Sequence, residues 1–421
     1  MASRVPAAYG SRMEERKAKA ATRFVLGTIF VYAIGFGIIM PVLPDLVVEL
    51  ADVSLPEATS IGGWLILTYA LFQFTFGPLV GSISDRFGRR PVLLLSLGGF
   101  SIDYAIMGLA PTLAWLFLGR ALAGAFGAAF STAYATMADI TDEENRARGF
   151  GLIGAAFGTG FIVGPAIGGL IGEFGTRLPF FVAAGLGAAN LIYGYFAFPE
   201  TLAHENRRPF RLVRANPLGA LLKLRMMPGV LPVAIVYLFW MSAQNIYPST
   251  WAYFTQIRFD WTPGMVGISL AWTGTIMALV QAFAVGPMVA RHGERRNAIL
   301  GIAISAAAYV LYAISPYGWA VFVIMAVTAL AALAGPAISS MMSRRVPAHM
   351  QGELQGFIAS LTALSAIIAP LTFNPSLAHF SGENAPVYFP GAAFAIAAAM
   401  ALTAMIILLL TRRSSEASAK S

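Results

Sequence analysis

Long apolar runs separated by short polar segments constrain the fold of this chain more than any other feature. A helix needs about 20 mostly apolar residues to cross a bilayer. Twelve runs meet this requirement, and the longest polar insert, 199–228, divides them into two sets of six. We therefore predict an all-α membrane protein with 12 transmembrane helices. The runs lie near 23–44, 58–80, 91–110, 112–138, 147–172, 178–198, 229–253, 263–288, 297–315, 318–342, 354–376 and 387–411.

Composition supports a membrane protein and excludes several other classes. The chain is 57% hydrophobic and only 11% charged, whereas soluble domains carry about 25% charged residues. A net charge of +8 raises the question of nucleic acid. The charges cluster between the apolar runs, however, so we expect a lipid bilayer and no nucleic acid as partner. The absence of cysteine excludes disulfides and thiol chemistry.

The basic residues indicate the orientation, because cytoplasmic loops of membrane proteins are enriched in lysine and arginine. If the N-terminus is cytoplasmic, 25 of the 28 basic residues fall in cytoplasmic segments; the others are Arg120, Arg177 and Arg258. Residues 1–22 lack the apolar stretch of a cleavable signal peptide. We predict cytoplasmic tails at 1–22 and 412–421.

The two halves of the chain resemble each other. Residues 73–95 match residues 281–300, and both copies contain a Gly-Pro pair followed by a Gly-x-Arg-Arg sequence or a close variant. The second copy is shorter and has lost the aspartate. Parallel repeats are one way in which transporters build two bundles around a central site. The sequence predicts six-helix bundles at 23–198 and 229–411, joined by a cytoplasmic linker at 199–228.

The segment "GSISDRFGRR", residues 81–90, resembles the signature loop between helices two and three of the major facilitator superfamily. Asp85 ends a predicted helix where it could meet the positive N-terminal end of a facing helix. Gly81 and Gly88 permit close approach and a tight turn. We predict a cytoplasmic gate here, with an ordinary basic loop as the alternative. Its further members are Arg86, Arg89, Arg90, Asp139, Arg146 and Glu200, the last pairing with arginines of 86–90 or 146–148.

The fifth predicted span, "GFGLIGAAFGTGFIVGPAIGG", resembles the antiporter motif of drug–proton exchangers. Gly160, Gly164 and Gly168 repeat every four residues and so form one smooth helix face. That face allows another helix to come close, and Pro165 weakens the local hydrogen bonding. The alternative is that these glycines serve packing alone. The remaining motif positions are Gly151 and Gly169.

Nearly the whole chain resembles the tetracycline-resistance efflux class, through "GFGIIMPVLPDL", "DYAIMGLAP", "LGRALAG", "ADITDEENRARGFG" and "QGELQGFIASLTALSAIIAPLTF". The resemblance implies a monomeric secondary transporter of the bacterial inner membrane. It would export a drug such as tetracycline, carrying a divalent metal, in exchange for protons. It implies no bound cofactor.

Three alternatives remain. A transporter of this fold could move another metabolite or a siderophore-like compound without proton coupling. A receptor or interaction protein could retain the fold without transport. A membrane enzyme is disfavoured, because one deep carboxylate and no nucleophile–base set are visible. The four histidines are scattered, and we predict no metal site.

Asp103 is the only acidic residue deep in a predicted span, and Arg120 is the only basic one. A charge at the bilayer centre costs at least about 3 kcal/mol, so such residues usually mark function. Each lies about eight residues from the turn at 111–112, or roughly 12 Å along a helix, so they share a depth. Direct pairing depends on helix rotation. We predict proton coupling by both, with help from Asp45; the alternative is a fixed structural pair.

Three positions depart from the efflux class. By resemblance, that class has a membrane aspartate at Tyr32, a histidine at Met277 and another aspartate at Ser305. The groups present here do not titrate near neutrality. Either Asp103 and Arg120 carry the coupling alone, Asp45 contributes, or the chain does not exchange tetracycline for protons.

The seventh predicted span offers residues for a binding cavity. Trp240, Gln244 and Tyr247 follow helical spacing on one face, beside Asn245. Aromatic rings with amides suit a flat polar ligand. An interhelical polar contact or an interfacial aromatic belt is the alternative. Further predicted binding residues are Tyr32, Trp272 and Gln281.

Overall fold

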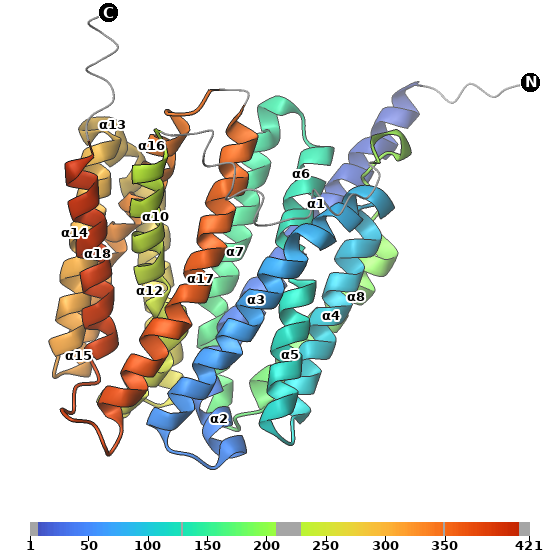
Figure 1. The fold of residues 1–421 in the computed structure, drawn as a ribbon. Helices are drawn as coiled ribbons and strands as arrows, with labels where there is room; N and C mark the ends of the chain where they lie inside the picture. Colours follow the sequence, from blue (N-terminus) through green and yellow to red (C-terminus); the bar gives the residue numbers. More distant parts are fainter. Residues whose placement is uncertain (1–6, 128, 208–228, 348–349, 412–421) are drawn as a thin grey trace, which may run out of the picture. The chain divides into compact units, whose positions relative to one another are not determined.

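The computed structural model describes residues 7–127, 129–207, 229–347 and 350–411, and within these ranges it contains helices and no strand (Figure 1). Side chains are described from residue 16 onward. The predicted tail at 412–421 and most of the predicted linker lie outside the described residues. The first helix begins at Ala7, within the predicted N-terminal tail, and continues into the first span.

The first half of the chain forms eight α-helices within the described ranges. They are α1 (Ala7–Ile39), α2 (Leu43–Ala51), α3 (Leu55–Phe87), α4 (Arg89–Leu109), α5 (Leu113–Phe126), α6 (Ala129–Ile140), α7 (Glu143–Gly172) and α8 (Leu178–Ala197). The second half forms α10 (Leu231–Gln244), α11 (Ile246–Phe259), α12 (Pro263–Val280), α13 (Gly286–His292), α14 (Glu294–Ile314), α15 (Gly318–Thr328), α16 (Ala334–Ser343), α17 (Gln351–Ser381) and α18 (Ala392–Leu410).

Eleven helical segments of the described chain are long and apolar enough to cross a membrane. The predicted seventh span is the exception, because it divides at Asn245 into α10 and α11, each of 14 residues. Pro248 follows three residues later and has no backbone N–H for the Gln244 carbonyl. The Asn245 side chain lies at this break, and its Nδ2 donates to the Met241 carbonyl at 2.9 Å and to Ser365 Oγ of α17 at 3.0 Å. The all-helical membrane fold is confirmed.

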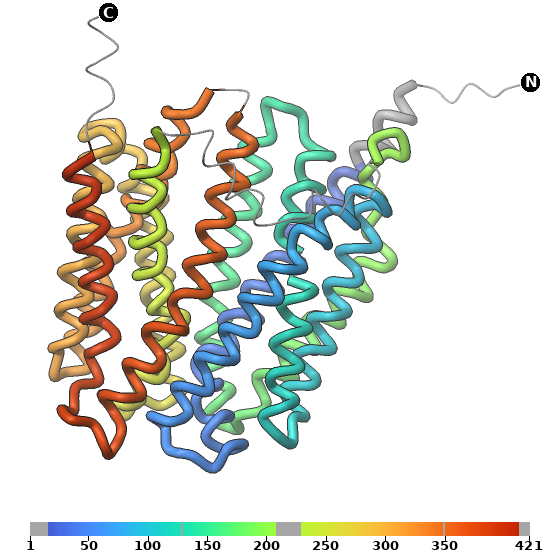
Figure 2. Tube along the Cα trace, in the orientation of Figure 1, coloured from blue at the N-terminus to red at the C-terminus, as the bar shows by residue number. Residues whose placement is uncertain are grey.

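The backbone contacts divide the chain into two compact units, whose courses can be followed by residue number in Figure 2. Unit 1 comprises Met1–Leu46, Leu71–Asn216 and Pro263–Ala271. Unit 2 comprises Val47–Ala70, Pro217–Thr262 and Trp272–Ser421. The first half of α3 is thus grouped with unit 2, and the first half of α12 with unit 1. The predicted bundles at 23–198 and 229–411 stay a prediction.

The internal repeat is visible in the helices themselves. Both α4 and α14 have 21 residues, and each follows a glycine with positive φ, Gly88 at 109° and Gly293 at 73°. Arg90 donates to the Tyr195 carbonyl in α8, and Arg295 donates to the Leu408 carbonyl in α18. The matching arginines therefore bind the last long helix of their own half.

Candidate functional site

The two deep charges, Asp103 of α4 and Arg120 of α5, form an ion pair inside unit 1. Arg120 Nη2 lies 3.0 Å from Asp103 Oδ2. The aspartate is fully buried and the arginine is 9% exposed. Gly119 makes the approach possible, since a Cβ there would lie 2.8 Å from Asp103 Oδ1. The direct pairing that the sequence left open is therefore present.

The two oxygens of the Asp103 carboxylate are in different situations. Oδ2 accepts from Arg120, whereas Oδ1 has no hydrogen-bond partner among the described residues. The same Arg120 Nη2 also lies 2.9 Å from Met107 Sδ. A buried polar atom without a partner costs about 1–3 kcal/mol, and more if it is charged. Because protonation removes the charge from this oxygen, the carboxyl group is chemically suited to accept a proton.

The second repeat has no such pair. When Gly88 is aligned with Gly293, Asp103 corresponds to Ala308 and Arg120 to Met325. Both Ala308 and Met325 are buried, at 3% and 1% exposed. The same helical arrangement therefore packs with apolar groups at these two positions. The ion pair is not a requirement of this helix pair, which favours a functional role.

Two of the three positions that depart from the efflux class, Tyr32 and Ser305, are buried and have packing roles here. Tyr32 is buried against Phe100, with ring centroids 4.7 Å apart. Ser305 is fully buried and donates to the Gly301 carbonyl within α14 at 3.0 Å. Asp45 lies in the first turn of α2, beyond the end of α1. Its predicted help in coupling stays a prediction.

Arg89 is the centre of a charged network at the beginning of α4. Its Nη1 lies 2.7 Å from Asp85 Oδ1, and its Nε lies 3.0 Å from Asp139 Oδ2. Nη1 also donates to Ser84 Oγ at 3.0 Å. Arg89 is buried and ties α4 to α3 and α6. Ser84 was missed by the sequence analysis, although it directly precedes Asp85 in the loop motif.

Glu200 takes the position at the helix terminus that we expected for Asp85. Its oxygens accept from the backbone nitrogens of Arg89 at 2.9 Å and Arg90 at 3.2 Å. A carboxylate at a helix N-terminus is favourable, because the first backbone N–H groups have no partner within the helix. The predicted pairing of Glu200 with arginines of 86–90 is therefore made through the backbone N–H groups of Arg89 and Arg90.

The other predicted gate residues each have different neighbours in the structure. Gly88 is required, because it has positive φ and a Cβ there would overlap the Glu200 carboxylate. Gly81 is not a close-approach position, since no atom lies within 4 Å of a Cβ there. Arg146 makes no ion pair with Asp139 in the described chain, and its Nε has no partner there. Arg86 lies over the Phe87 ring at 5.0 Å.

The glycines of α7 form the predicted close-packing face. A Cβ at Gly160, Gly164 or Gly168 would lie within 2.6 Å of a carbonyl oxygen of α1. Gly169 faces a different neighbour, since its Cβ would meet the Cα of Gly267 in α12 at 3.0 Å. Gly151 has no atom within 4 Å and does not take part. Pro165 lies inside a continuous α7 and contacts α1 at Gly37.

The predicted binding residues belong to several local arrangements. Gln244 accepts a hydrogen bond from the Tyr309 hydroxyl, and Tyr247 packs against the same ring at 5.9 Å between centroids. The sequence analysis missed Tyr309; its place on the apolar stretch "AAAYVLYAI" gave no polar signal. Asn245 lies at the α10–α11 break and binds Ser365 of α17. Convergence of these side chains on one ligand stays a prediction.

The three outlying residues of this predicted set have different neighbours. Trp272 donates from Nε1 to the Phe322 carbonyl at 3.1 Å. Gln281 begins a five-residue π-helical stretch, Gln281–Val285, and is exposed. Tyr32 belongs to unit 1. Among the described residues no group of three or more histidine, aspartate or glutamate side chains could hold a metal ion.

Comparisons with known proteins give a consistent result. The sequence profile of the Major Facilitator Superfamily matches residues 25–370 and 233–421. Tetracycline resistance protein, class C, from Escherichia coli is 43% identical over 84% of this chain and 89% of its own length. The class G protein of Vibrio anguillarum is 38% identical over 86% and 91%. The crystal structure of a D-xylose-proton symporter superimposes with a TM-score of 0.74 at 16% identity, covering 95% of this chain and 99% of the symporter.

Proposed function

This chain belongs to the Major Facilitator Superfamily, and from that premise we propose that it exports tetracycline in exchange for protons by alternating access. The similarity to tetracycline resistance proteins along most of the chain supports the substrate. The observation that carries the coupling is the buried Asp103–Arg120 pair, with one carboxylate oxygen left without a partner. The membrane context and a small-molecule substrate follow from the family.

Proton coupling would use the difference between the two oxygens of Asp103. In the ionised form, Arg120 compensates the charge through Oδ2. A proton arriving at the carboxyl group neutralises it and weakens its attraction to the guanidinium. Loss of the negative charge of Asp103 changes the electrostatic balance around buried Arg120, and an arrangement of α4 and α5 that suits the neutral carboxyl group becomes more favourable. A ligand shifts a conformational equilibrium only through such a difference between states.

We also propose a membrane, an orientation and an oligomeric state for the chain. We place the chain in the inner membrane of a bacterium, with both termini in the cytoplasm and one chain per transporter. The distribution of lysine and arginine supports this orientation. Tetracycline would travel as a divalent-metal chelate, so the metal is part of the substrate and no resident cofactor is involved.

Drug susceptibility tests the substrate. Expressed in an efflux-deficient bacterium, the chain should raise the inhibitory concentration of tetracycline, and Asp103→Asn should return it to the level of the empty vector. Asp260→Asn is the matched control, because Asp260 is exposed and its left-handed φ of 52° suits asparagine. Unchanged susceptibility at normal membrane expression of the wild type would remove tetracycline as the substrate.

A second function in the same fold is export of another organic compound without protons. The observation that favours it is that the side chains of Tyr32, Met277 and Ser305 do not titrate near neutrality. A susceptibility screen over a panel of compounds distinguishes the two functions. Protection against a different compound, unaffected by Asp103→Asn, would support the second function.

A further inference from the structure

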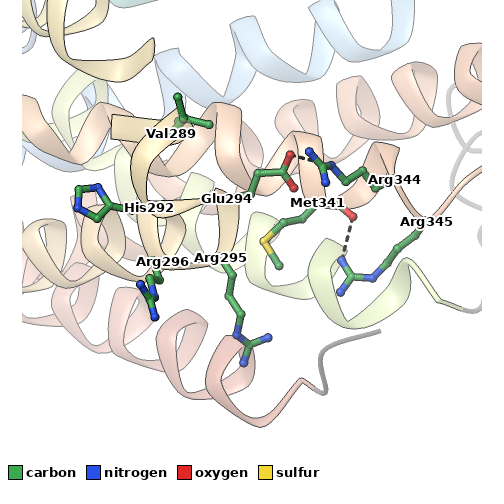
Figure 3. Close-up of a pocket in the computed structure, with 10 residues that line it drawn as sticks. Val289, His292, Glu294, Arg295, Arg296, Met341, Arg344 and Arg345 are labelled. Atoms are coloured by element: carbon green, nitrogen blue, oxygen red, sulfur yellow. Dashed lines mark hydrogen bonds and ion pairs between the residues drawn. The ribbon is translucent and has the colours of Figure 1, made fainter. Parts of the chain in front are cut away.

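A basic cavity of about 930 Å³ lies in unit 2, where α13, α14 and α16 end or begin. Four arginines line it, together with His292 and a single carboxylate, Glu294 (Figure 3). The arginines are Arg295, Arg296, Arg344 and Arg345. The cavity is thus strongly positive, and the proposed export mechanism makes no use of it.

The single carboxylate is already occupied. Glu294 Oε1 lies 2.9 Å from Arg344 Nε and also accepts from Ser340 Oγ. Figure 3 shows Arg344 directed at Glu294 and Arg345 directed at the Met341 carbonyl, to which its Nη1 donates at 2.9 Å. Partial burial and the positive charge of Arg295 both lower the pKa of Arg345. The guanidinium groups of Arg295 and Arg345 are therefore close enough to repel each other.

Two arginines of the cavity, Arg295 and Arg296, have no carboxylate partner among the described residues. Arg295 donates to the carbonyls of Leu408, Leu409 and Thr411 at the end of α18. Carbonyl oxygens carry only a partial negative charge, so the guanidinium charge stays largely uncompensated. Arg296 is exposed and forms no ion pair with any described residue.

The first repeat shows how the same position is balanced when the chain supplies the anions. There Arg89 pairs with Asp85 and Asp139, and Glu200 caps the helix. In the second repeat the acidic and basic residues exchange places. Glu294 occupies the position of Arg89 after the positive-φ glycine, and its basic partner, Arg344, follows the end of α16. Among the described residues that line the cavity, one carboxylate is present where the first repeat has three. An anion from outside the chain would restore the balance.

We propose that this cavity binds the phosphate group of an anionic phospholipid. Guanidinium groups bind phosphate oxygens in bidentate geometry, and basic pockets between membrane helices bind lipid headgroups. A lipid is favoured over a free phosphate because α14 and the α15–α16 segment are long and apolar enough to cross the membrane. The last turn of α18, which Arg295 contacts, also carries exposed Leu409 and Leu410, against which an acyl chain can lie.

Native mass spectrometry of the full chain in detergent tests the proposal. Phosphatidylglycerol should bind more tightly than phosphatidylcholine. Arg296→Gln should weaken phosphatidylglycerol binding by about fivefold, the value expected for one basic residue at a membrane surface. Arg345→Gln should act in the same direction. Arg291→Gln is the matched control, since Arg291 is an exposed neighbour that does not line the cavity, and it should leave the lipid preference unchanged.

Two results would overturn the proposal. Equal phosphatidylglycerol affinity of the wild type, Arg296→Gln and Arg345→Gln would show that the cavity is not the lipid site. Displacement of the lipid by millimolar inorganic phosphate, lost in Arg296→Gln, would assign the cavity to a soluble anion. Because the measurement is of lipid binding and not of transport, its failure leaves the proposed export function untouched.

Discussion

At the scale of single residues, the central feature is a carboxylate whose two oxygens differ. Asp103 was conspicuous in the sequence because a charge inside the bilayer is costly. Arg120 could be named as a candidate partner from its depth, but the direct pairing and the unpaired Oδ1 were not predictable, because both depend on the rotation of α4 and α5. The prediction of close approach at Gly81 was wrong, because no neighbouring atom lies within 4 Å of a Cβ at this position.

The second repeat suggests a variant that separates structure from function. Asp103→Ala combined with Arg120→Met reproduces the residues of the second repeat, Ala308 and Met325. We expect the double variant to be more stable than either single variant, because each single change leaves a buried charge without its partner, at about 3–5 kcal/mol. Thermal unfolding in detergent measures this order.

The same double variant should have lost tetracycline resistance, since no titratable group remains at the pair. Retained resistance in a folded double variant would show that the ion pair is structural. A double variant less stable than both single variants would contradict the argument from the repeat.

At the scale of helices, the length of the apolar runs predicted nearly every membrane-spanning segment, and the four-residue repeat of glycine predicted the α7 face against α1. The hydrogen bond from Asn245 at the α10–α11 break was not predictable, because its acceptor, Ser365, is 120 residues away in the sequence. The cap of α4 by Glu200 was missed for the same reason, because the carboxylate oxygens of Glu200 accept from backbone N–H groups more than 100 residues away in the sequence.

The α7 face can be tested by adding a single methyl group. Gly164→Ala would place a Cβ against the Ile34 carbonyl of α1, and such overpacking costs about 1–3 kcal/mol. Gly158→Ala is the matched control on the same helix, because no atom lies within 4 Å of a Cβ there. We expect a lower unfolding temperature in detergent for Gly164→Ala alone. Equal stability of the two variants would contradict the close packing.

At the scale of the whole molecule, the duplication predicted a pair of equivalent helices, and α4 and α14 match in length and in the glycine that precedes them. What sequence could not predict is that the two copies divide the charges differently. The first copy holds the membrane ion pair and the compensated Arg89 network. The second copy holds apolar residues at the former position and an excess of arginine at the latter.

The Arg89 network should act on the transport cycle and not on the substrate site. Asp85→Ala removes one of the two carboxylates that bind the Arg89 side chain. We expect slower tetracycline transport in proteoliposomes and unchanged equilibrium binding of tetracycline by isothermal titration calorimetry. Asp260→Asn again serves as the control. Loss of equilibrium binding in Asp85→Ala would place Asp85 at the substrate instead.

The most direct test of proton-coupled export is accumulation of tetracycline in proteoliposomes with an acidic interior. Protons leaving the vesicle should drive tetracycline inward against its gradient, and a protonophore should abolish the accumulation. Asp103→Asn should bind and exchange tetracycline down its gradient but should not accumulate it. Accumulation by Asp103→Asn at the rate of the wild type would contradict the role of Asp103 as the proton carrier.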